Sequence, residues 1–186
     1  MRNLVLGLLV AVLPVASMAA KYELDPTHTY PNFEINHLGF STMSGMFTSS
    51  KGSFEMDQDK GTGSVSVTID AASIFTGFKK RDDHLKSPDF FNVNEFPEIT
   101  FKSSSVKFSG KTDATVMGKL TIMGVSKDVT LMVNNIVCGD NPFSKKPTCG
   151  FNATTKVKRS DFGLKYGLPA IGDDVAIRLE AEGIRQ

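Results

Sequence analysis

Apolar side chains recur at every second position along much of this chain, and that period constrains the fold more than any other feature. The most regular segments are 64–70, 116–122, 129–134, 151–158 and 175–182. A β-strand places successive side chains on opposite faces, so each segment predicts a strand with one buried and one solvent-facing side. Residues 32–37 and 101–108 fit the pattern more loosely. Short polar links at 109–113 and 123–128 predict hairpins, and therefore an antiparallel meander.

About eight such strands fit an all-β fold, an extended eight-stranded antiparallel barrel, because closure removes the exposed edges of a meander. A two-sheet sandwich has the same local signals, so alternation alone leaves both architectures open. Residues 78–96 interrupt the alternation. The charged run at 79–86 and the Ser87-Pro88 pair predict two short helices, a helical insertion near residues 79–92. Phe96-Pro97 then predicts a return to extended backbone.

Residues 1–19 have the features of a secretory signal. Arg2 supplies a positive charge, an apolar run follows it, and small residues precede Ala19. The apolar run is shorter than the roughly 18 residues that a membrane span needs. We expect cleavage after Ala19, or alternatively after Ala20, which leaves residues 20–186 as one exported domain.

The chain has two cysteines, Cys138 and Cys149, with turn-forming residues between them. In an oxidising compartment such a pair predicts a structural disulfide. A redox-active pair is the alternative, but it normally shows C-x-x-C spacing. A bridge that closes so short a loop would stabilise the fold by roughly 3 kcal/mol.

The sequence contains no recognised catalytic arrangement. The formal net charge of +1 gives no electrostatic attraction to nucleic acid. No G-x-S-x-G motif is present, and the adjacent carboxylates Asp82-Asp83 and Asp173-Asp174 point apart on a strand or cap backbone amides. The basic residues of 156–159 are expected to form a solvated face. We expect a protein that is not an enzyme, with no required cofactor and no metal, since no ligand spacing links the three histidines, His28, His37 and His84.

A barrel of eight strands either fills its interior with side chains or encloses one ligand. Small residues at Gly118 and Ala153 interrupt the expected inward set. Its other members are apolar: Phe33, Ile35, Phe54, Val65, Val67, Ile69, Leu120, Leu131, Phe151 and Val175. Ordinary cores use the same residue types, so composition leaves both interpretations open. A cavity with this lining would select hydrocarbon, at roughly 0.8 kcal/mol per buried methylene.

One long motif, RDDHLKSPDFF at residues 81–91, is accompanied by shorter ones along the chain. The shorter motifs are Asp25-Pro26-Thr27-His28, FEINHLGF at 33–40, Gly45-Met46-Phe47, PEITF at 97–101, GKLTI at 118–122, Gly124-Val125 and RSDFG at 159–163. Together they resemble the YceI-like family of polyisoprenoid-binding proteins. The resemblance extends over essentially all of the chain that follows the predicted signal, and the long motif is its most specific part.

The resemblance implies a lipocalin-like periplasmic barrel that encloses a long isoprenoid lipid, either a polyprenyl chain or an isoprenoid quinone. It therefore favours the barrel over the sandwich, and a binding or carrier protein over an enzyme. One alternative is an accessory protein or enzyme that acts on the bound quinone or lipid, and another is a stress-related scaffold without lipid. Transient contact with a membrane or a quinone enzyme is a further expectation. The oligomeric state is left open, with a homodimer as one option.

The expected ligand contacts combine inward strand residues with the helical insertion. They are Phe33, Ile35, His37, Phe78, Arg81, His84, Leu85, Phe90, Phe91, Phe96 and Phe162. The aromatic residues of the insertion either line the cavity or simply pack onto the barrel. Most of the charged side chains at 81, 82, 84 and 161 are expected to fix the insertion by hydrogen bonds, because buried charges need partners. His37 or His84 is the alternative contact for a polar headgroup.

Overall fold

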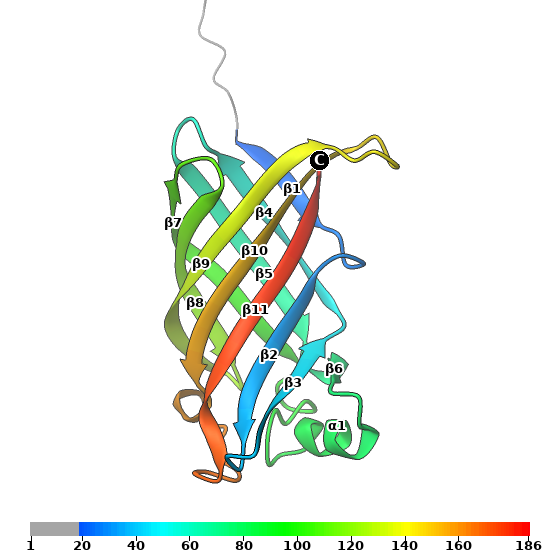
Figure 1. Ribbon diagram of the computed structural model, residues 1–186, viewed down its shortest axis with the longest axis vertical. Coiled ribbons are helices and arrows are strands. Elements are labelled where there is room, and N and C mark those ends of the chain that lie inside the picture. Colours follow the sequence, from blue (N-terminus) through cyan, green and yellow to red (C-terminus); the bar gives the residue numbers. More distant parts are fainter. Residues whose placement is uncertain (1–18) are drawn as a thin grey trace, which may run out of the picture.

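Eleven strands, one α-helix and two 3-10 turns make up residues 19–186, the part of the chain that the computed structural model describes (Figure 1). The predicted secretory signal lies almost wholly outside the described residues. The helix α1 spans Lys79–Lys86, and the turns are η1 (Ala71–Ser73) and η2 (Arg159–Phe162). The strands are β1 (Ala20–Leu24), β2 (Tyr30–His37), β3 (Ser41–Phe47), β4 (Ser50–Asp57), β5 (Thr62–Asp70), β6 (Ile74–Phe75), β7 (Glu98–Ser109), β8 (Asp113–Ile122), β9 (Val125–Asp140), β10 (Pro147–Lys158) and β11 (Ile171–Arg185).

Strand pairing closes the sheet into a barrel. The order runs β1-β4-β5-β7-β8-β9-β10-β11, and β1 pairs back onto β11. Strand β2 continues along β11 beyond β1, and β3 pairs with β2. The interrupted strands β1/β2 and β3/β4 therefore each occupy one of eight positions around the barrel. Every pairing is antiparallel, so the predicted eight-stranded barrel is confirmed and the sandwich alternative is wrong.

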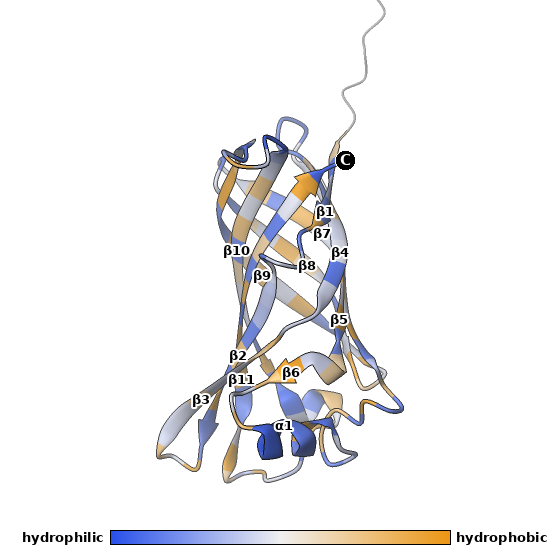
Figure 2. Cartoon of the chain, turned by 90° about the vertical axis from the view of Figure 1, so that its right-hand side faces the viewer, coloured by the Kyte–Doolittle hydropathy of each residue, from blue (hydrophilic) through white to orange (hydrophobic). Residues whose placement is uncertain are grey.

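The predicted alternation of apolar and polar residues is visible along the strands (Figure 2). Strand β8 is regular, with Ala114, Val116, Leu120 and Ile122 buried. Strand β7 contains one additional residue between Ser103 and Ser105, where the register against β8 shifts. Such a bulge sets two residues against one on the partner strand and interrupts the alternation locally. The serines in the middle of the predicted strand mark this bulge.

One end of the barrel is closed by residues 76–97, which we call the capping segment (Figure 1). The helical insertion and its first helix are confirmed, but the second predicted helix is wrong. Residues from Ser87 to Phe96 form successive turns instead. Ser87 has φ −73° and ψ 170°, an extended conformation. The ring of Pro88 disfavours helical geometry at the preceding residue, so α1 ends at Lys86.

The opposite end of the barrel carries both ends of the described chain and the β9–β10 hairpin (Figure 1). Cys138 in β9 stands directly opposite Cys149 in β10, with Cα atoms 4.1 Å apart. The two form a disulfide, which confirms the predicted bridge. The bridge ties together the base of the hairpin that projects beyond the barrel.

The turn between β1 and β2 is organised by the Asp25 carboxylate. Its Oδ1 atom accepts hydrogen bonds from the Thr27 backbone N (2.9 Å) and the Thr27 hydroxyl (2.6 Å). The His28 Nδ1 atom lies 2.9 Å from Oδ2. The Thr27 hydroxyl and then His28 lower the pKa of Asp25 to about 2, and the same carboxylate raises the pKa of His28. Each shift favours the charged form of its group in the folded state.

The stability that Asp25 contributes depends on pH. A depressed carboxyl pKa gives stabilisation that is complete above the ordinary value of 3.8 and is lost as the pH falls toward about 2. We therefore expect wild type to exceed Asp25→Asn in melting temperature above about pH 4, and the gap to close as the pH approaches 2. The difference in melting temperature also narrows as the pH rises through the raised pKa of His28, because neutral His28 no longer has a charge that pairs with Asp25. Thermal melts across the pH range check this, and a gap that is constant with pH contradicts it.

Candidate functional site

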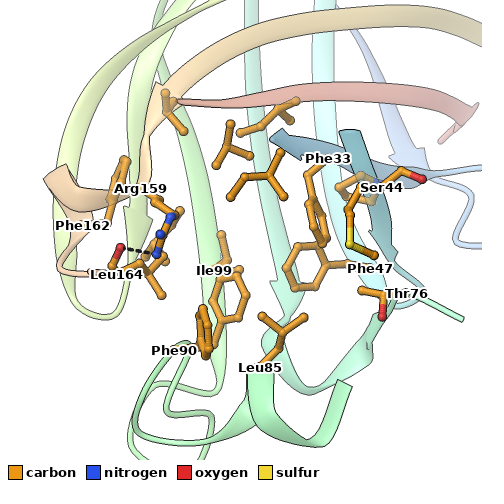
Figure 3. A pocket seen from close by; sticks show the side chains of 18 of the residues that line it. Phe33, Ser44, Phe47, Thr76, Leu85, Phe90, Ile99, Arg159, Phe162 and Leu164 are labelled. Carbon is orange, nitrogen blue, oxygen red and sulfur yellow. Dashed lines mark hydrogen bonds between the residues drawn. The ribbon is translucent and has the colours of Figure 1, made fainter. Parts of the chain in front are cut away.

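An apolar cavity of about 350 Å³ lies inside the barrel at the end closed by the capping segment (Figure 3). Seven strands contribute inward side chains to its wall, because the period of two aims every second residue at the lumen. One representative from each of β2, β3, β5, β7, β8, β10 and β11 is Phe33, Phe47, Ile69, Ile99, Leu120, Val157 and Ile177. The capping segment adds Leu85, Phe90 and Phe91 from below. The result is a hydrocarbon-lined chamber at one end of the lumen.

Most of the predicted ligand contacts meet at this cavity. Phe78 does not, because it caps the N-terminus of α1 and is 56 % exposed. Phe96 does not line it either: its ring lies beside Gly124 in the β8–β9 turn, where an added Cβ would be 3.1 Å from Cε1. Both aromatic side chains therefore belong to the capping segment but lie outside the cavity wall. The nine that line the cavity are Phe33, Ile35, His37, Arg81, His84, Leu85, Phe90, Phe91 and Phe162.

Aromatic contacts join the capping segment to the barrel wall. Phe47 of β3 packs edge-on against Phe91, with ring centroids 5.6 Å apart, and its ring is 6.0 Å from that of Phe33. On the other side, Tyr166 in the β10–β11 connection lies 5.0 Å from His84 and 5.2 Å from Phe90. Such pairs contribute about 0.5–1.5 kcal/mol each beyond the area that they bury. They hold the cap against two sides of the lumen.

The polar groups of the capping segment form hydrogen bonds mainly with one another. The Asp82 carboxylate accepts hydrogen bonds from the Thr76 backbone N and hydroxyl. Arg81 donates to the Thr76 hydroxyl and carbonyl, both at 2.8 Å, and to the Met43 sulfur at 3.7 Å. The prediction that Arg81 and Asp82 fix the insertion is thereby confirmed.

The other two charged positions behave differently. The His84 Nε2 atom bonds to Asp89 within the cap, at 2.9 Å. Asp161 is the exception to the expectation that most of these residues fix the insertion: it is exposed in η2, and among residues 19–186 no hydrogen bond joins it to the cap. Helix α1 is therefore tied to Thr76, where the capping segment leaves β6, and through Arg81 to Met43 of β3, and its paired polar atoms leave the cavity surface largely apolar.

Arg159 corrects the expectation that residues 156–159 form a solvated face. Its side chain is only 6 % exposed and lies at the cavity wall (Figure 3). The guanidinium donates to four backbone carbonyls, those of Leu164 (2.8 Å), Tyr166 (2.9 Å), Ile171 (3.1 Å) and Gly172 (2.8 Å). Burial lowers the pKa of this guanidinium. Arg159 thus holds the β10–β11 connection in place, and backbone carbonyls satisfy its charge at the cavity wall.

Among the cavity residues that the sequence-based prediction did not name are Phe47, Arg159 and Tyr166. Phe47 and Arg159 both belong to short motifs of the family resemblance, which was the available signal for them. Tyr166 lies in an irregular connection, where no periodicity reports on the direction of a side chain.

The chemistry that this arrangement offers is sequestration of an apolar molecule from water. Within residues 19–186, no group of three or more His, Cys, Asp and Glu side chains is placed to hold a metal ion. In the same range, no helix has the length and apolarity to cross a membrane.

A closed antiparallel barrel, with an apolar chamber that a helical cap closes at one end, is the class of protein that these features define. The YceI-like domain profile matches residues 22–183, and the chain belongs to this family. Protein YceI of Escherichia coli O17:K52:H18 is 38 % identical over 192 residues, covering 100 % of both chains.

Solved structures agree with this assignment. BcnA of Burkholderia cenocepacia superposes with a TM-score of 0.75 at 26 % identity, covering 86 % of this chain and 98 % of that one. A polyisoprenoid binding domain from Saccharophagus degradans, implicated in plant cell wall breakdown, superposes with a TM-score of 0.65 at 17 % identity, covering 91 % and 100 %. The latter likeness shows a shared fold.

Replacing Arg159 by Met removes the donors to four carbonyls while keeping an unbranched side chain. An unsatisfied buried polar group costs about 1–3 kcal/mol, so we expect a loss of at least about 3 kcal/mol in the free energy of unfolding. Urea denaturation measures it, and hydrogen exchange locates the faster amides at 163–172. Lys158→Met is the matched control, because Lys158 forms only an exposed ion pair with Asp174 and should change stability by about 1 kcal/mol or less. Equal stability of the two variants would contradict the anchoring role.

Proposed function

We propose that this protein binds one long-chain isoprenoid lipid, a polyprenyl chain or an isoprenoid quinone, and carries it through the periplasm. The observation that carries the proposal is the 350 Å³ chamber, whose surface is almost entirely apolar and in which the polar groups of the cap are paired with one another. Burial of each methylene contributes roughly 0.8 kcal/mol. A hydrocarbon chain would therefore bind without any charged contact.

The orientation of the bound lipid follows from where the wall meets solvent. His84 and Tyr166 line the cavity and are 44 % and 50 % exposed. A polar headgroup placed between them would keep its contact with water and could hydrogen bond to the imidazole or the phenol. The chain would then extend inward past Phe90 and toward Leu120. His37, also on the wall, is the second candidate for the headgroup.

Binding without chemical conversion is favoured by the state of the reactive groups. Both cysteines are joined in the disulfide at the far end of the barrel. Arg81 and Arg159 donate to Thr76 and to backbone carbonyls. A bound lipid would meet neither a thiol nor a free cation inside the chamber. The disulfide and the predicted signal support export to an oxidising compartment. The polyisoprenoid binding domain of the same fold supports the ligand class.

Native mass spectrometry of protein purified from the periplasm without detergent tests this proposal. We expect one apolar lipid per chain, and organic extraction followed by mass spectrometry then identifies its class. Protein that emerges free of lipid, and that takes up none of a total lipid extract, would contradict the proposal.

A substitution that fills the chamber provides the second half of the test. Val157→Trp adds a large ring at the cavity wall and should abolish lipid retention. Lys156→Trp is the matched control, because Lys156 neighbours Val157 on β10 and its side chain is 65 % exposed on the outer face. Loss of lipid from both variants would point to a defect of folding and not to occupancy of the chamber.

A further inference from the structure

The chamber occupies only one part of the lumen. Along β11, Val175 and Ile177 line it, but the next inward residues, Leu179 and Ala181, pack into the core. Strand β5 shows the same change, from Ile69 at the cavity to buried Val67. The ligand space therefore ends at a defined level along the barrel axis.

A packed layer forms that end. Val67 of β5 and Phe101 of β7 are paired neighbours, and each is 7 % exposed. The Phe101 ring lies against the backbone of Gly118 in β8, where an added Cβ would be only 2.6 Å from Cζ. Leu179 extends the layer from β11. Because Gly118 has no side chain, the Phe101 ring fits into this layer.

A second layer of side chains lies behind the first and fills the lumen, so the chamber does not continue there. Phe54 of β4 stacks on Tyr22 at 4.9 Å and meets Phe151 of β10 edge-on at 5.3 Å. Strands β4 and β10 are separated by β1 and β11, so the contact between Phe54 and Phe151 spans the lumen. Gly183 makes room for it, because a Cβ there would lie 2.4 Å from the Phe54 ring. Aromatic rings thus fill the barrel beyond the first layer.

We propose that the layer of Val67, Phe101 and Leu179 is a chain-length stop that sets which isoprenoid lipids fit. An engineered protein cavity of roughly 150 Å³ holds one benzene molecule. By that scale, the 350 Å³ chamber holds roughly fourteen carbon atoms, about three isoprene units. A longer chain leaves its excess outside the chamber, where it gains no burial. This inference rests on the proposed function and adds a length limit to it.

Binding of a homologous series of isoprenols to lipid-free protein tests the stop. The probes are geraniol, farnesol, geranylgeraniol and solanesol, in order of increasing chain length, with affinity measured by native mass spectrometry. For wild type, affinity rises at least about tenfold from geraniol to farnesol, since each buried methylene adds a factor of about four. Beyond farnesol it rises by less than about threefold, because the fourth and later isoprene units are not buried.

Phe101→Ala opens the layer from β7 and Leu179→Ala opens it from β11, so the plateau moves to longer chains in either variant. Geranylgeraniol then binds at least about tenfold more tightly than farnesol. Phe54→Ala is the matched control: it removes the same ring from the layer behind, leaves the stop in place and keeps the wild-type plateau. Circular dichroism verifies that each variant is folded.

Three results overturn the stop. Wild-type affinity that keeps rising to solanesol shows that the chamber does not end at this layer. An unchanged plateau in folded Phe101→Ala and Leu179→Ala shows that these side chains do not set the limit. Absence of binding by every isoprenol refutes the proposed function, and the stop with it, whereas the first two results leave the proposed function standing.

Discussion

The pairing of β1 with β11 determines what the remaining structure can be. Tyr22, Glu23 and Leu24 pair with residues 183–185 and join the first strand to the last. Without this contact, the sheet would have two free edges and its apolar face would need a second layer to cover it. With it, every second side chain of each strand faces a shared lumen. Closure is thus the condition under which an interior chamber can exist.

Residue size divides that lumen into two parts. Toward the termini, Tyr22, Phe54 and Phe151 meet across the barrel and exclude any ligand. Toward the capping segment, the inward strand residues are mostly aliphatic, and the bulk is provided by a cap that joins the barrel through few polar contacts. The ligand space therefore lies at the end of the barrel that the capping segment closes. Asp82 and Arg81 hold α1 to Thr76 at the start of the capping segment, and Arg159 holds the β10–β11 connection.

Much of this architecture could be predicted from the sequence, since alternation is a local property. In β8 and β5, the alternation of apolar and polar residues is enough to predict which side chains face the lumen. Local pattern could not decide between barrel and sandwich, because the choice depends on the long-range pairing of Tyr22 with Arg185. The local pattern also misleads at Ser87, because Ser87-Pro88 predicts the start of a second helix, whereas Pro88 ends α1. Arg159 shows a further limit: its four carbonyl partners come from an irregular connection, so its burial has no periodic signature.

The central claim is that the lumen at the cap end holds a hydrocarbon chain and that the lumen at the other end does not. A crystal structure with a farnesyl chain that carries a terminal bromine tests this most directly, because the anomalous signal locates the chain end. The account predicts the bromine inside the barrel, next to Leu120 and Ile177 and below Phe101. A bromine on the outer surface, or beyond Phe101 toward Tyr22, would contradict it.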